Sequence, residues 1–222
     1  MLAGVRRVAL LSSLALACTL RGDGGLLEEE RTLAYFDVVE VFDEFAVTLR
    51  VDAGAVAGET QLVEVRGDTN AMDRLFTQVH AEATLSINVD PNHLTSLTTT
   101  PSLSARLPAL TRVYATDASV VQISGAGEAL ALELHGDATL TLREADAVAL
   151  DVIAADAAAL TLAGAGPTLT LAVSGAATVD ARRFAAAAVI VDAQGDGEIV
   201  VCSTGAAQID GPGAARVVQR CG

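Results

Sequence analysis

The sequence predicts an all-β fold, a parallel β-solenoid (single-stranded β-helix) with coils of about 20 residues. Three observations predict it. Short strands alternate apolar and polar residues, Gly and Asp separate the strands, and Val and Thr are frequent within them. The strands also open 19 or 20 residues apart, at Val121, Leu140, Leu160, Val179 and Ile199.

The regular coils begin near residue 107 and continue to the end of the sequence. A second alternating strand precedes the polar break of each coil, as Leu130, Leu132 and Leu134 do before Gly136. A single coil cannot bury its inner face alone, so several must stack about 4.8 Å apart. The competing interpretation, a helix over Ala-rich residues 182–191, is disfavoured by the β-branched residues at period two.

The N-terminus has the pattern of an export signal, predicted over residues 1–17. Arg6 and Arg7 precede an apolar run over residues 8–17, which is too short to cross a bilayer as a helix. Cys18 directly after Ala17 indicates a bacterial lipoprotein, whose cysteine carries a lipid that anchors the chain in a membrane. An ordinary soluble export signal and a twin-arginine route are the alternatives.

Residues 18–30 are polar and Gly-rich and contain three consecutive Glu, so we expect a flexible spacer between anchor and folded body. Residues 31–222 are expected to form one solenoid domain, which is less regular before residue 107. The expected location is the cell envelope, at the outer membrane or in the periplasm. A soluble periplasmic or secreted protein is the alternative.

The charge balance argues against a nucleic-acid partner. All 14 basic residues are Arg, 28 acidic residues oppose them, and the formal net charge is −14. No basic stripe is present that could displace the counterions of a phosphate backbone. Only 3% of the residues are aromatic, which argues against an aromatic-lined pocket.

Cys202 and Cys221 lie 19 residues apart, which is one repeat. In a solenoid this spacing places their Cα atoms roughly one strand spacing apart, within the range that a disulfide accepts. We predict a disulfide that closes the last coil, formed after export to an oxidising compartment. Two free thiols near a frayed end are the alternative.

Three stretches resemble parts of a known bacterial family. "YFDVVEVFDEFAVTLRV" (35–51) resembles its opening strand pair, and "VEVRGDTNAMDRLFTQVHAEATLSI" (63–87) resembles its Gly-Asp-x-Asn turn with the following strand. "LPALTRVYATDASVVQISGAG" (107–127) resembles its Pro-x-Leu entry into the coils. The family is the putative auto-transporter adhesin head GIN domain, and the resemblance covers residue 31 to the end. It implies a β-solenoid exported by Gram-negative bacteria with a surface or binding role. The partner that we expect is an envelope protein or a glycan, of unknown identity.

Four turn aspartates are candidate cation ligands: Asp117, Asp137, Asp156 and Asp196. Their carboxylates could line one edge of the stack and bind Ca²⁺. The column is broken at Ala176, however, and Asp in a turn commonly accepts hydrogen bonds from its own backbone, so the turn role is favoured. The three His residues lie far apart without ligand spacing, and neither a metal site nor a cofactor is expected.

Two tripeptides, residues 21–23 and 66–68, read Arg-Gly-Asp, a sequence known from cell attachment. One lies in the expected spacer and the other in the Gly-Asp-x-Asn turn. Such tripeptides recur by chance and turns favour Gly-Asp, so we assign them no binding role.

A polysaccharide lyase or hydrolase is the alternative to a non-catalytic structural or adhesion module, because some parallel β-helices carry acidic clusters on an outer face. Outward side chains that could form such a cluster are Asp151, Asp180, Asp192, Arg143 and Arg182. Their spacing singles out no catalytic set, and no nucleophile or metal motif is present. The non-catalytic module is therefore the favoured interpretation, with no catalytic residue assigned.

Overall fold

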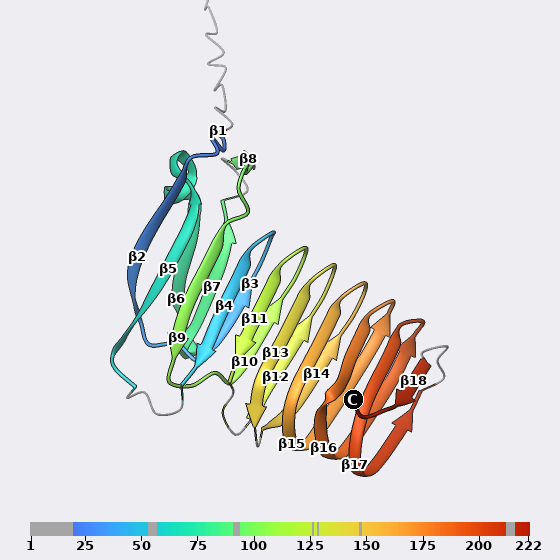
Figure 1. The fold of residues 1–222 in the computed structure, drawn as a ribbon. Coiled ribbons are helices and arrows are strands. Elements are labelled where there is room, and N and C mark those ends of the chain that lie inside the picture. Colours follow the sequence, from blue (N-terminus) through green and yellow to red (C-terminus); the bar gives the residue numbers. More distant parts are fainter. Residues whose placement is uncertain are drawn as a thin grey trace, which may run out of the picture.

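A computed structural model confirms the predicted β-solenoid, with parallel stacked coils of about 20 residues in about five turns (Figure 1). It describes residues 20–52, 57–90, 94–125, 127, 129–146, 148–211 and 216–222. The predicted signal peptide, residues 1–17, and Cys18 lie outside this part of the chain. No helix among the described residues is long and apolar enough to span a bilayer.

The solenoid is flattened between two parallel sheets, which we call face A and face B. Face A contains, in order, β9 (Ser102–Leu107), β4 (Ala46–Val51), β11 (Val120–Ser124), β13 (Thr139–Asp146), the first parts of β15 (Ala159–Gly175), β16 (Thr178–Gly195) and β17 (Glu198–Asp210), and β18 (Arg216–Gln219). Face B contains β7 (Thr84–Val89), β3 (Val38–Val41), β10 (Arg112–Ala115), β12 (Ala129–Leu134), β14 (Ala149–Ala154) and the later parts of β15, β16 and β17.

The core consists of aliphatic ladders, in which each buried residue lies above its equivalent in the neighbouring coil. On face A the buried column is Val47, Val121, Leu140, Leu160, Val179 and Ile199, each at most 2% exposed. On face B it is Val39, Val113, Leu132, Val152, Leu171 and Val191. This parallel, in-register pairing explains why the sequence repeats the same alternation every coil.

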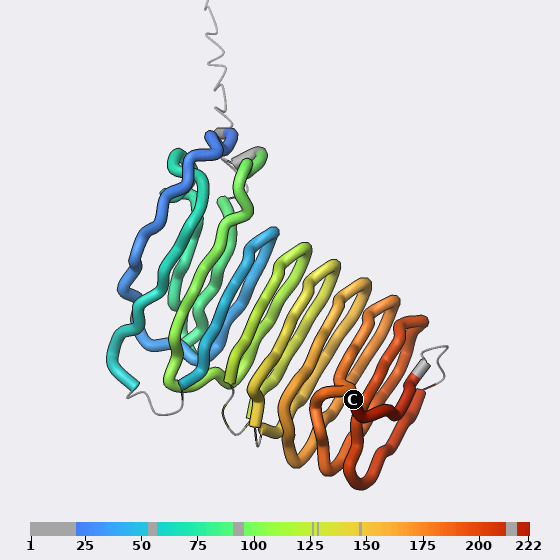
Figure 2. Tube along the Cα trace, viewed as in Figure 1, coloured from blue at the N-terminus to red at the C-terminus, as the bar shows by residue number. Residues whose placement is uncertain are grey.

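The strands β3 and β4 precede the other coil-forming strands in the sequence, but they do not form the terminal coil of the stack. β3 and β4 lie between the β7–β9 coil and the β10–β11 coil, as the blue segment between green neighbours in Figure 2 shows. Beyond β9 the sheet continues antiparallel through β5 (Thr60–Asp68) and β2 (Leu26–Ala34), and beyond β7 through β6 (Leu75–His80). Two short 3₁₀ turns flank β6, η1 (Thr69–Arg74) and η2 (Ala81–Ala83).

The expectation of a flexible spacer over residues 18–30 is wrong for the described part of that segment. β1 (Leu20–Arg21) pairs with β8 (Leu94–Ser96), and Leu26–Glu30 form the first half of β2 against β5. The three consecutive Glu residues are exposed, but they lie in β2, a strand at the edge of the sheet. Arg31 holds this strand over the end of the solenoid, donating to the backbone oxygens of Leu75 at 2.6 Å and Met72 at 3.0 Å.

At the other end, β18 covers the first part of β17 on face A. A Cys202–Cys221 disulfide joins the chain after β18 to β17, with a Cα–Cα distance of 4.6 Å. Cys202 is 4% exposed, so the bond lies at the edge of the aliphatic core. It links the last strand covalently to the preceding coil.

The ladder predicts a large cost for a cavity in a central coil. Leu140→Ala should lower the free energy of unfolding by about 2–5 kcal/mol, because its neighbours on both sides are fixed in register. Thr139→Ala on the exposed side of the same strand should change it by less than about 0.5 kcal/mol. Urea unfolding of both variants measures the difference, and equal effects would contradict the described register.

Candidate functional site

The predicted aspartates lie at the corner that leads from face B to face A. Asp117 and Asp156 adopt left-handed backbone conformations, with φ of 57° and 60°. Asp43, Gly136 and Gly175 occupy the equivalent corners with φ between 61° and 66°. Asp and Gly tolerate this region better than other residues, so the turn geometry itself explains the Gly/Asp pattern.

The corner carboxylates accept hydrogen bonds from the backbone of the adjoining coil. Asp156 accepts from the Gly136 N–H at 3.1 Å, and Asp117 accepts from the Asp43 N–H at 3.3 Å. Asp43 in turn accepts from the Val89 N–H at 3.0 Å. These bonds tie successive coils together at the corner and give the aspartates a structural role.

The four candidate cation ligands do not occupy equivalent positions. Asp137 and Asp196 each lie one residue after the corner glycine, Gly136 or Gly195, whereas Asp117 and Asp156 are themselves the corner residue. Across the described ranges, no group of three or more His, Cys, Asp or Glu side chains is arranged to hold a metal ion. The arrangement therefore provides coil-to-coil hydrogen bonds at the corner and does not align the four carboxylates in one column.

The residues considered for an enzyme do not converge. Asp180 on face A is paired with Arg182 at 2.8 Å, and Arg143 lies on the same face in another coil. Asp151 and Asp192 extend from face B. Burial raises the pKa of Asp180, but hydrogen bonds and the charge of Arg182 outweigh it, so the pKa of this carboxyl lies below its ordinary value. Asp180 is thus held ionised, the opposite of what a general acid needs.

A second feature is a buried carboxylate that fastens the N-terminal segment. Asp68 is 0% exposed and accepts from the backbone N–H groups of Thr98 at 2.7 Å, Gly24 at 3.1 Å and Thr99 at 3.2 Å. The Asn70 side chain donates to the Arg21 carbonyl at 2.8 Å. We call this arrangement around Asp68 the N-terminal latch. Asp68 is the aspartate of the Arg-Gly-Asp tripeptide at residues 66–68, so the carboxylate of that tripeptide is already bound within the protein.

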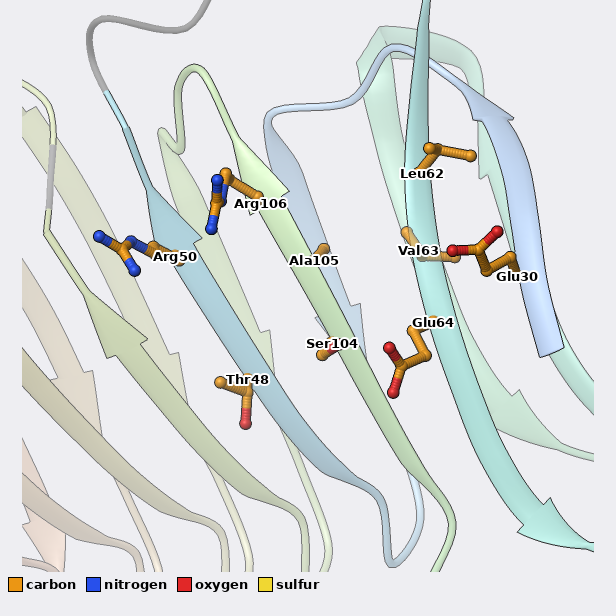
Figure 3. Close-up of a pocket in the computed structure, with 9 residues that line it drawn as sticks. All are labelled: Glu30, Thr48, Arg50, Leu62, Val63, Glu64, Ser104, Ala105 and Arg106. Carbon is orange, nitrogen blue, oxygen red and sulfur yellow. The ribbon is translucent and has the colours of Figure 1, made fainter. Parts of the chain in front are cut away.

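A groove of about 490 Å³ hollows the outer surface where face A passes into the antiparallel strands. Its floor contains Val63 and Ala105, and its rim contains charged and hydroxyl side chains from β2, β4, β5 and β9. Figure 3 shows Arg50 and Arg106 on neighbouring strands at one side of the groove, and Glu30 and Glu64 at the other. Thr48, Ser104 and Leu62 complete the lining.

Strand register places the two positive charges of the groove next to each other and the two negative charges next to each other. Arg50 is the parallel partner of Arg106, and Glu30 is the antiparallel partner of Glu64. None of these four side chains forms an ion pair or hydrogen bond with another residue that the structure describes. The groove therefore presents two free cations and two free carboxylates to the solvent.

Face B carries a row of half-buried rings across three successive coils. The centroids of Phe42 and Tyr114 are 5.8 Å apart, and those of Tyr114 and His135 are 5.6 Å apart. Glu133 beside this row accepts from Arg112 at 2.6 Å and contacts His135 at 3.1 Å. In contrast to the groove charges, these polar groups already have protein partners.

The family resemblance is confirmed by comparison with known proteins. The family described as putative auto-transporter adhesin, head GIN domain, matches residues 36–221. No curated protein matches the chain.

Solved structures share the fold at low identity. A putative adhesin from Bacteroides fragilis NCTC 9343 has a TM-score of 0.73 at 14% identity, covering 90% of this chain and 99% of that chain. A putative adhesin from Parabacteroides distasonis ATCC 8503 has a TM-score of 0.59 at 15% identity, covering 90% and 99%. A putative lipid binding protein from the same organism has a TM-score of 0.59 at 14% identity, covering 92% and 98%. At these identities the likeness shows the architecture alone.

If Asp156 has a structural role at the corner, its replacement should lower the free energy of unfolding modestly, and calcium should not change the stability of the wild type. Asp156→Ala should lower the free energy of unfolding by about 1–2 kcal/mol, because it loses a hydrogen bond and places Ala in the left-handed region. Asp156→Gly should cost less, since Gly adopts this conformation freely. Thermal unfolding with and without millimolar Ca²⁺ checks the assignment, and a calcium-dependent rise in the wild-type midpoint would contradict it.

The N-terminal latch predicts a pH-dependent contribution to stability. Burial raises the pKa of Asp68, but the N–H donors of Thr98, Thr99 and Gly24 outweigh it and lower the pKa below its ordinary value. The stabilisation is therefore complete above the ordinary Asp pKa and is lost as the pH falls through the lowered one. Asp68→Asn should cost about 1–3 kcal/mol at pH 7.

Unfolding free energies of wild type and Asp68→Asn, measured from pH 7 downward, test this sign. The difference between the two proteins should shrink only in acid. A difference that is constant with pH, or that grows as the pH falls, would show that the Asp68 carboxylate does not act as described.

Proposed function

Since the chain belongs to the family described as putative auto-transporter adhesin, head GIN domain, we propose that it is a non-catalytic binding module of the bacterial cell envelope. In this proposal residues 1–17 direct export and Cys18 carries a lipid that anchors the chain in a membrane. The solenoid then presents its outer surface to a partner. Envelope glycans and envelope proteins are the partner classes considered.

The observation that carries the proposal is that one groove gathers four charged side chains. The described interior is filled by aliphatic ladders, whereas the groove on the outer surface brings together two Arg and two Glu side chains that pair with no other residue in the described part of the chain. Like charges directly opposite each other on paired strands are destabilising, and a hollow with a few convergent polar groups is the usual form of a ligand site. A binding role uses these groups directly.

The N-terminal latch supports anchoring close to the membrane. Only Thr19 and Leu20 separate Cys18 from Arg21, whose carbonyl accepts from Asn70. The backbone of Gly22 packs directly against the Asp68 carboxylate, since a Cβ at this position would overlap it. A lipid on Cys18 would therefore hold the latch end of the solenoid beside the bilayer and leave the disulfide end pointing away.

The alternative, a polysaccharide lyase or hydrolase, has one feature in its favour. Glu30 and Glu64 lie opposite each other, and a pair of carboxylates is what glycoside hydrolysis requires. Catalysis also needs one of them kept protonated at neutral pH, which burial in an apolar pocket achieves. Glu30 is exposed at an open groove, so the geometry favours binding over cleavage.

Anchoring predicts a mass change and a change of location. The protein purified from envelopes should begin at Cys18 and carry a lipid adduct, and Cys18→Ser should leave an unlipidated protein in the soluble fraction. Intact-mass measurement and fractionation check this outcome. A wild-type chain without a lipid, recovered in the soluble fraction, would contradict the anchor.

Adhesion tests the binding role with the same pair of strains. Cells carrying the wild-type chain should adhere to glycan-coated or envelope-protein-coated surfaces better than cells carrying Cys18→Ser. Equal adherence to every surface, from strains with equal amounts of protein, would count against the proposed function. Release of sugar fragments from the glycan surface would favour the enzyme alternative.

A further inference from the structure

We propose that the groove between β4, β9, β5 and β2 is the ligand site and that its ligand is an acidic saccharide, whose carboxylate binds Arg50 and Arg106. This inference rests on the proposed binding function and names the ligand class. Figure 3 shows the two guanidinium groups on the same side of the groove, with Thr48 and Ser104 two residues earlier on the same two strands.

The arginine pair has the character of an anion site. Arg50 and Arg106 are register partners on adjacent strands, so their backbones lie about 4.8 Å apart and their like charges repel. The sequence contains 28 acidic residues against 14 Arg, yet neither side chain of this pair has an acidic partner within the described structure. A carboxylate between the two guanidinium groups would relieve the repulsion and form charge-assisted hydrogen bonds.

The opposite wall suits the hydroxyl groups of a sugar. Glu30 and Glu64 offer carboxylate oxygens, which accept hydrogen bonds from hydroxyl groups. Ser104 lies in register with Glu64 on one side and Thr48 on the other, so these three polar side chains form a row across the strands β5, β9 and β4. A ligand that fits this groove carries a carboxylate for the arginines and hydroxyl groups for this row, as a uronic acid does.

A lipid membrane fits the groove less well. Leu62 is the one exposed large apolar side chain among the groove residues, with 60% exposure, and gives no enclosed space for an acyl chain. A saccharide needs only the polar rim and the shallow floor.

The test uses the full-length Cys18→Ser chain, which keeps the whole solenoid in solution, and a trimer of galacturonic acid as the probe. Titration calorimetry should show binding that weakens about tenfold or more when Arg50→Gln and Arg106→Gln are combined. Arg220→Gln, an exposed arginine at the other end of the solenoid, is the matched control and should bind like the parent chain. Binding of the parent should also weaken as salt is raised.

Two controls accompany the titration, the thermal stability of the double variant and a neutral saccharide. An unchanged thermal midpoint shows that the double variant is folded. A neutral galactose trimer should bind at least about tenfold more weakly than the acidic trimer, since it lacks the group that the arginines recognise.

Several results would overturn the inference. Equal affinity of the parent and the double variant would remove the arginine pair from the site, and loss of binding on Tyr114→Ala alone would move the ligand to the ring row of face B. Binding of phosphatidylethanolamine vesicles without binding of the acidic trimer would replace the saccharide by a lipid. If wild-type cells adhere to coated surfaces while the acidic trimer does not bind, this inference fails and the proposed function stands; if neither occurs, both fail.

Discussion

The parallel, in-register pairing of successive coils is the constraint on which the rest of the structure depends. A single coil exposes its inner aliphatic residues and leaves the backbone hydrogen-bonding groups of both edges unpaired. A neighbouring coil in the same register on each side buries these residues and pairs these groups. The Val47-to-Ile199 and Val39-to-Val191 columns meet this requirement on the two faces. The same register places outward side chains in rows, which is how Arg50 comes to lie beside Arg106.

A stack of this kind must be closed at both ends, and the chain uses a different device at each. At the N-terminal end, antiparallel strands cover the first coil, Arg31 binds backbone oxygens across the gap, and Asp68 fastens the segment around Gly24. At the C-terminal end, β18 and the Cys202–Cys221 disulfide cover part of the last coil. The antiparallel closure also makes the groove, because it brings Glu30 and Glu64 next to the arginine strands.

The regular coils could be predicted from the sequence because their information is local: alternation, corner Gly or Asp, and a constant interval. The N-terminal part could not, since pairing between β2 and β5 or β3 and β10 joins residues far apart and leaves no periodic signal. The turn role of the aspartates could be predicted because Gly and Asp are typical of tight turns, whereas the one-residue offset of Asp137 and Asp196 from the corner residues could not be read from the spacing. Nothing in the sequence marked Arg50, Arg106, Glu30 and Glu64 as neighbours, because their proximity is a result of topology.

Amide hydrogen exchange of the full chain, read residue by residue, tests the stacked-coil account most directly. If each coil is stabilised by its neighbours, amides of β13 and β14 in the middle of the stack should be the slowest to exchange on both faces. Protection should then fall toward the ends, with β2 and β18 exchanging earlier. Fast exchange in the central coils, or protection on one face only, would contradict the described register.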